Sequence, residues 1–202
     1  INIPNTVENM NNTFRGLKYL KDYDLTSLTN LKVAKGIFAE TNIVDSSNVL
    51  PSSVTNMEKA FEGCILLETP INLTNYPNVS NIKQIYSNCT SLKTIPDLSD
   101  IGVDELEAEG AFYSCYNASN EKLTISDKVK GNAFTKCDAK IDSISLISDG
   151  DVYQAGAIDT SGSSAGGSTV IDYPSTMLMS TANKAVGNRC VLRASMNGTD
   201  FP

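Results

Sequence analysis

Four cysteines are the residues of this sequence whose type and spacing first suggest chemistry. They are separated by 25, 26 and 22 residues, and no C-x-x-C pair occurs. Zinc ribbons and thioredoxin-like redox sites need such close pairs, so the spacing supports neither. Small buried hydrophobic residues that fill one slot of a repeating unit explain the pattern better, and mostly free thiols are expected. The four residues are Cys64, Cys89, Cys115 and Cys137.

The chain contains no histidine. This removes the commonest general base near neutral pH and the commonest metal ligand, and it excludes Ser–His and Cys–His nucleophilic pairs. A carboxylate-based hydrolase would need two facing acids in a cleft, and no matched pair is evident. Asp149 and Asp151 flank a glycine, but the other acidic ligands of a calcium loop are missing at the required spacing. We therefore predict a non-enzyme without a cofactor or a metal ion.

Charge and composition limit the partners. The net charge is −7, the pI is about 4.6 and the hydrophobic fraction is 41%, which is typical of a folded chain. An acidic chain repels phosphate backbones and anionic lipids, so we expect no nucleic acid partner. No stretch approaches the roughly 18 apolar residues that span a bilayer, so no direct membrane insertion is expected. Because the sequence starts at Ile1, we expect a processed chain or part of a longer one.

An internal repeat positions the cysteines. Aromatic residues recur at gaps of 24, 23, 25, 26 and 22 residues, and the four cysteines each follow an aromatic residue by three positions. In the first two copies Leu17 and Thr41 take the place of the cysteine. Such self-similarity at a fixed period is typical of stacked repeats. The predicted core residues of the repeat are Phe14, Phe38, Phe61, Tyr86, Phe112, Phe134 and the four cysteines.

Spacing within each copy predicts a helix followed by a short strand. Apolar residues lie seven and four positions before the aromatic residue and three after it, as on one face of a helix. Asn56 is expected to cap the helix start, and Gly63 to end it in a left-handed conformation. A brief extended run with prolines, such as Leu67–Leu73, then fits one strand.

We therefore expect an α/β solenoid of about six leucine-rich-repeat coils, each of about 24 residues and built from a helix and a short strand. The strands would form a parallel sheet along the stack, with the aromatic residues and cysteines as inward ladders.

Two segments carry a family resemblance. They are VTNMEKAFEGCILLETP at 54–70 and VSNIKQIYSNCTSLKTIP at 79–96, and they resemble the BspA-like leucine-rich repeats of bacterial surface, protist surface and bacteriophage proteins. The resemblance covers roughly residues 5–147. It implies adhesion or protein recognition outside a cell, with no catalytic residues to carry over.

The sequence changes character after the repeats. We predict a solenoid over residues 1–147, a Gly/Ser-rich linker or loop over 148–169, and a small C-terminal β extension or docking segment over 170–202.

The strand-bearing face of the predicted solenoid is the expected ligand surface, because such faces suit macromolecules. Exposed aromatic residues often anchor interfaces, which draws attention to Tyr19 and Tyr23. The alternative is a solvated sheet face with Tyr23 in the core. The predicted ligand-binding residues are Tyr19, Asp22, Tyr23, Glu68, Thr69, Lys93, Thr94 and Asp97.

Two functions remain open at this level. The first is a non-catalytic recognition or adhesion module of a secreted or cell-surface protein, which binds a protein or glycan on another cell. The second is a structural or receptor-binding part of a bacteriophage virion, such as a fibre or capsid decoration, whose partners are other subunits of the assembly. Both rest on the repeat and on the absence of catalytic residues.

Overall fold

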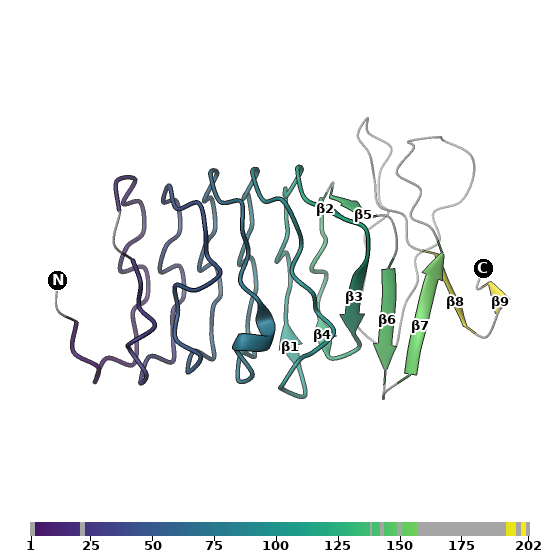
Figure 1. Cartoon of the computed structure of the whole chain (residues 1–202), viewed down its shortest axis with the longest axis horizontal. Helices are drawn as coiled ribbons and strands as arrows, with labels where there is room; N and C mark the ends of the chain where they lie inside the picture. Colours follow the sequence, from purple (N-terminus) through teal and green to yellow (C-terminus); the bar gives the residue numbers. More distant parts are fainter. Residues whose placement is uncertain are drawn as a thin grey trace.

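Coils of the repeat stack side by side along the long axis of the molecule (Figure 1). The computed structural model describes residues 3–20, 23–137, 139–141, 144–148, 151–156, 193–196 and 199–200. We number the coils one to six by their central aromatic residues, which are Phe14, Phe38, Phe61, Tyr86, Phe112 and Phe134.

The predicted helix-plus-strand coil is wrong. Within the described ranges no α-helix forms, and the sole helical element there is a 3₁₀ turn, η1 (Leu73–Asn75). In place of the helix each of coils one to five has a turn segment, which we define as residues 10–16, 34–40, 57–63, 82–88 and 108–114. In coil three, Lys59 and Gly63 have φ of 58° and 68°. Each of these segments has two such left-handed residues, at the second position before and the second position after the aromatic residue. A right-handed helix cannot include them.

Backbone hydrogen bonds in the turn segments alternate between two directions. In coil one, Thr13 N–H donates to the Met10 carbonyl and closes a tight turn. The next N–H, that of Phe14, instead donates to Ile37 of coil two at 2.9 Å. This alternation gives the backbone N–H groups hydrogen-bond partners without a helix, because one N–H group bonds within its own coil and the next bonds to the following coil. Apolar residues three and four positions apart still reach one side, which explains why the pattern resembled a helix.

Regular strands are also fewer than predicted. Coils one to four are joined mainly by isolated parallel bridges, such as Asn9 with Val33 and Asp45 with Thr69. The parallel pairs are β1 with β4, β2 with β5, and β3 with β6, and antiparallel pairing then continues from β6 through β7 and β8 to β9. Their bounds are β1 Leu106–Glu107, β2 Ser119–Asn120, β3 Leu123–Ser126, β4 Val129–Lys130, β5 Lys140–Ile141, β6 Ile144–Ser148, β7 Asp151–Gly156, β8 Arg193–Met196 and β9 Thr199–Asp200.

The core is a ladder of aromatic rings that runs through all six coils. Neighbouring ring centroids lie 5.4–6.2 Å apart, and the planes are inclined by 10–29°. Offset stacking at such distances adds to the free energy gained from burial alone. The rings of coils two to six are buried, whereas Phe14 of coil one is half-buried.

Coil two is one residue shorter at the corner that follows its turn segment. Ile43 is buried there, and Val44 is exposed. The core position that Leu67 and Leu92 fill six residues after the ring is therefore filled by Ile43, five residues after it. Counting six residues after the ring would assign this core position to Val44, and the structure assigns it to Ile43.

The predicted domain limits remain predictions. Residues 157–192, which include most of the predicted Gly/Ser-rich segment and much of the predicted C-terminal extension, lie outside the described residues. Strand β7 falls within the range 148–169, and β8 and β9 fall within 170–202.

Candidate functional site

The cysteines form a second ladder beside the rings. Cys64 Sγ donates to the Phe38 carbonyl at 3.0 Å, and Cys89 Sγ donates to the Phe61 carbonyl at 3.0 Å. Cys115 repeats the contact one coil later, at 3.2 Å from the Tyr86 carbonyl. Each of these thiols therefore joins two coils through the carbonyl of an aromatic residue. Cys64, Cys89 and Cys115 are buried free thiols, and Cys137 is also buried.

Burial keeps these thiols protonated. It raises the pKa of Cys64, Cys89 and Cys115 above the ordinary value of a thiol. The thiolate is the nucleophile and the metal ligand, so a buried thiol of raised pKa is chemically inert. Thr41 takes the cysteine slot in coil two, and its hydroxyl donates to its own coil's Phe38 carbonyl at 2.8 Å. The Thr41 hydroxyl and the Cys64 thiol are thus both small donors to the same carbonyl.

Asparagine and aspartate side chains shape the turns of each coil. Asn56 Oδ1 accepts from the N–H of Glu58 at 2.9 Å, and Asn81 repeats this contact with Lys83. The predicted cap is therefore a local turn contact, with no helix behind it. Asp97, one of the predicted ligand residues, is used in the same way, because it accepts from the N–H of Ser99 at 2.7 Å.

The described part of the chain shows neither a cluster of metal ligands nor a helix that could span a membrane. Within the described ranges, no three His, Cys, Asp or Glu side chains are placed to hold a metal ion together. Among these same residues, no helix has the length and apolarity that a membrane crossing requires. Asp149 and the side chain of Asp151, the two acids considered above for a calcium loop, lie outside the described part of the structure.

Half of the predicted ligand residues come together on one side of coils three and four. Lys93 N–H donates to the Glu68 carbonyl at 3.0 Å, and the two side chains form an ion pair. Thr69 and Thr94 follow them in the two coils, and both are exposed. This column continues into coil five, because Ser119 N–H donates to the Lys93 carbonyl at 2.8 Å.

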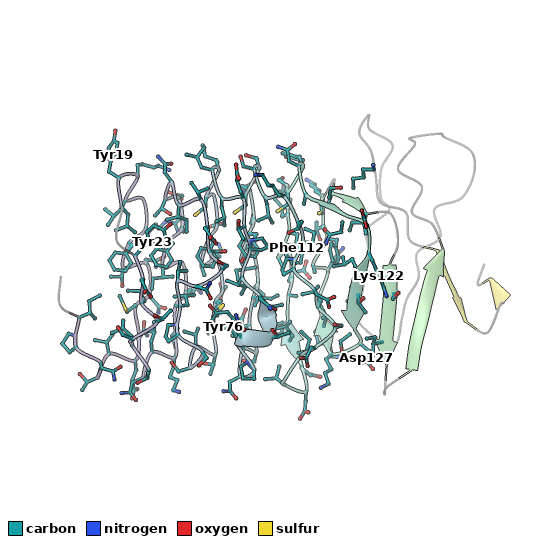
Figure 2. All side chains as sticks on the ribbon, viewed as in Figure 1. Tyr19, Tyr23, Tyr76, Phe112, Lys122 and Asp127 are labelled. Atoms are coloured by element: carbon teal, nitrogen blue, oxygen red, sulfur yellow. The ribbon has the colours of Figure 1, made fainter. Side chains whose placement is uncertain are left out.

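The remaining predicted residues lie elsewhere. Tyr19 is 93% exposed and projects from the end of coil one (Figure 2). Tyr23 is half-buried, and its ring meets that of Phe38 edge-on at 5.8 Å. Tyr23 is thus partly a core residue, whereas Tyr19 is free to contact a partner. Asp22 lies outside the described residues.

Exposed apolar side chains gather on one corner of the stack. We call this corner the corner ridge and define it as residues 17–19, 42–44, 65–66, 90–91 and 116–117. Every large apolar side chain that is exposed in the described part of the chain lies on it. Besides Tyr19 these are Leu17, Val44, Ile65, Leu66 and Tyr116, each close to half exposed.

Hydrogen bonds on both sides hold the corner ridge in one row. Before it, Gly63 N–H donates to the Ser87 carbonyl at 2.7 Å, and after it, Lys93 N–H donates to the Glu68 carbonyl at 3.0 Å. Sequence reasoning missed all of the ridge except Tyr19. The available signal was the apolar pair Ile65–Leu66, directly after the buried slot of Cys64, where no core position was left to receive both.

The turn segments and the residues next to them carry charges that neutralise one another. Lys35 pairs with Glu58 at 2.9 Å, and Lys83 pairs with Glu107 at 2.6 Å, in each case across adjacent coils. Hydrogen bonding to Glu107 raises the pKa of Lys83. The turn segments thus present paired charges, in contrast to the apolar corner ridge.

Comparison with known proteins gives one family. No curated protein and no solved structure matches the chain. Residues 8–128 match the family described as "Mycoplasma protein of unknown function, DUF285", a stretch that holds coils one to five and more than half of the chain. The chain therefore belongs to the DUF285 family of Mycoplasma proteins.

Proposed function

We propose that the chain is a non-catalytic recognition module that binds a protein or glycan of another cell through the corner ridge and the adjoining polar column. The observation that carries this proposal is the concentration of exposed apolar side chains on the ridge. Soluble proteins rarely leave such side chains grouped unless the group contacts something.

The composition of the ridge supports binding over catalysis. Tyr19 supplies a large exposed ring at one end and Tyr116 another at coil five, with apolar Ile65 and Leu66 between them. Beside them, Glu68 and Lys93 form an ion pair that offers polar contacts at the rim. An apolar centre with a polar rim is the usual anatomy of a protein-binding surface.

The location of the protein belongs to the same proposal. The resemblance of segments 54–70 and 79–96 to BspA-like repeats supports a place on the cell surface or outside the cell. Membership of a Mycoplasma protein family is compatible with either location. The fold alone does not carry this inference, because one fold serves many functions.

Binding to intact cells tests the proposal. Labelled, purified chain is added to bacterial and animal cells, with protease-treated and glycosidase-treated cells alongside. We expect saturable binding that one treatment abolishes, which would also decide between a protein and a glycan ligand. A variant with Tyr19→Ser, Leu66→Ser and Tyr116→Ser should lose most of this binding, because it removes three of the exposed apolar side chains of the ridge.

A charge-preserving variant outside the corner ridge serves as control. Exchange of the partners of one ion pair, Lys83→Glu with Glu107→Lys, keeps the net charge and leaves the ridge untouched. It should bind like the unchanged chain. Equal loss in both variants, or no binding to any cell, would contradict recognition through the ridge. Absence of binding would favour the virion alternative, in which the partners are other subunits.

A further inference from the structure

The ridge residue Tyr116 lies between two residues whose side chains tie coil five to coil four. On one side of it, Cys115 Sγ donates to the Tyr86 carbonyl at 3.2 Å. On the other side, Asn117 Nδ2 donates to the Thr90 carbonyl at 2.7 Å. Both chain neighbours of Tyr116 are therefore fixed to coil four, so the backbone that carries its ring has little freedom to move.

The backbone just beyond the ridge is also fixed to coil four. Ser119 N–H donates to the Lys93 carbonyl at 2.8 Å. Asn120 then forms two hydrogen bonds with Ile95, because its Oδ1 accepts from the Ile95 N–H and its Nδ2 donates to the Ile95 carbonyl, both at 2.9 Å. A carboxamide that pairs with both backbone groups of one residue holds them in one orientation. The corner of coil five is thus held at the ridge and beyond it.

Ile65 occupies the equivalent ridge position in coil three and provides a matched comparison. Each residue lies four positions after the ring of its coil, and the exposed fractions are 50% for Ile65 and 51% for Tyr116. Ile65 also follows a thiol that bonds to the coil before it, that of Cys64. The next residue is Leu66, whose side chain has no hydrogen-bond donor, where coil five has Asn117. Of these two coils, only coil five therefore has the second tie.

A tyrosine held in this way is suited to anchor an interface. Ordering a side chain on binding costs conformational entropy, and a tyrosine loses little because its ring is rigid and turns about two side-chain bonds. About half of the Tyr116 side chain is already covered by its own protein, and the backbone beneath it is fixed. Most of the ordering has thus taken place before a partner arrives.

We propose that Tyr116 is the anchor of the corner ridge and that Asn117 is a positioning residue that holds the anchor ready for binding. The inference rests on the proposed function, because it concerns the same ridge. It goes further by assigning most of the binding free energy to one ring at coil five, although the apolar side chains of the ridge are spread over several coils.

Single substitutions at the two matched positions test the anchor. Binding of the labelled chain to intact cells should weaken about tenfold or more in Tyr116→Ala, and about two- to threefold in Ile65→Ala, because few residues of an interface carry most of its affinity. Tyr116→Phe keeps the ring and should bind within about threefold of the unchanged chain. Urea unfolding checks that each variant is folded. Losses of similar size in Tyr116→Ala and Ile65→Ala would overturn the anchor.

Asn117→Ala tests the positioning role, because it removes the tie and keeps the ring. Binding should weaken about three- to tenfold, mainly through faster dissociation, since Tyr116 must then be ordered by the partner. In the free chain, the nuclear magnetic resonance order parameter of the Tyr116 amide should fall from about 0.85 to below about 0.6, while that of Ile65 stays unchanged. An ordered Tyr116 in this variant, or binding equal to that of the unchanged chain, would overturn the positioning role.

Failure of this inference and failure of the proposed function give different results. If the unchanged chain binds to no cell, the proposed function is contradicted and the anchor is lost with it. If the unchanged chain binds and the two alanine variants at Tyr116 and Ile65 lose binding equally, the ridge stays a binding surface and only the anchor is overturned.

Discussion

Tyr86 is the single tyrosine in a ladder otherwise made of phenylalanines, and its hydroxyl explains the exception. The N–H of Ile71 donates to Tyr86 Oη at 2.7 Å. Ser46 uses its own hydrogen on the Thr69 carbonyl, so Tyr86 donates to Ser46 Oγ at 3.2 Å. One buried hydroxyl therefore satisfies polar groups of coils two and three from its place in coil four. Because this hydroxyl is buried, the pKa of Tyr86 lies above the ordinary value of a tyrosine.

Tyr86→Phe should destabilise the chain by roughly 1–3 kcal/mol, because the buried N–H of Ile71 loses its acceptor. Urea unfolding followed by circular dichroism measures the change. Tyr113→Phe, which removes the hydroxyl of a half-buried tyrosine on the outside of coil five, is the matched control and should change little. A cost for Tyr86→Phe no larger than that of the control would contradict the network.

The thiol ladder gives stability a defined pH dependence. Burial raises the pKa of Cys64, Cys89 and Cys115 in the folded state, so the folded chain keeps protons that the unfolded chain releases above about pH 8.5. The unfolded state then binds fewer protons, and stability falls as pH rises. The loss should be roughly 1.4 kcal/mol per pH unit for each thiol until its folded pKa is reached.

Urea unfolding between pH 7.5 and 10 measures this slope. Cys115→Ala removes one titrating thiol. The free energy of unfolding of this variant should therefore fall less steeply with pH, by the contribution of one thiol, whatever the variant's stability at neutral pH. An unchanged slope in the variant would mean that Cys115 does not hold its proton on folding.

At the scale of the element, the sequence predicted the repeat but not the shape of its parts. The apolar spacing of Val54, Met57, Phe61 and Cys64 fits one face of a helix, and it fits successive tight turns equally well. Residues at such spacing reach one side in both cases, so periodicity could not decide between them. The deciding signal was glycine: Gly36 lies in the middle of the presumed helix of coil two, where it is unfavourable in a helix but suited to a φ of 59°.

The candidate site was predictable only in part, for a related reason. Repeat phase alone brings equivalent positions of adjacent coils together, and Lys93 N–H accordingly donates to the Glu68 carbonyl. That these residues and the neighbouring Thr69 and Thr94 bind a ligand stays a prediction. The corner ridge depends on where each coil bends. Coil two is a residue shorter at its corner, so repeat counting alone assigned Val44 to the core.

Left-handed turn positions predict a contrast between two substitutions in coil three. Gly63→Ala places a Cβ on a residue with φ of 68° and 3.3 Å from Glu40 Cγ, and should cost roughly 1–2 kcal/mol. Lys59→Gly relieves the same strain at φ of 58°, which offsets the greater flexibility of glycine in the unfolded chain, and should be close to neutral. Thermal unfolding compares the two, and a helix would show the opposite preference, with Lys59→Gly the more costly.

At the scale of the whole molecule, stability should be distributed along the ring ladder. Phe61→Ala opens a cavity between two buried coils and should cost roughly 3–5 kcal/mol. Phe14→Ala removes a half-buried ring with one ring neighbour in the ladder, and should cost roughly 1–2 kcal/mol. Urea unfolding of both variants measures the difference. Similar costs would mean that coil one is as tightly packed as the middle of the stack.

The alternating hydrogen bonds of the turn segments also give the stack an electrical direction. At each of the interfaces from coil one to coil five, four N–H groups of the turn segment point toward the following coil, and the accepting carbonyls point back toward coil one. Peptide dipoles aligned in this way add together, as they do in an α-helix. A smaller number of N–H groups, such as those of Lys32, Thr55 and Ser80, point back toward coil one and offset part of the sum. The turn segments therefore make the stack more negative toward coil one than toward coil five, and salt screens this difference.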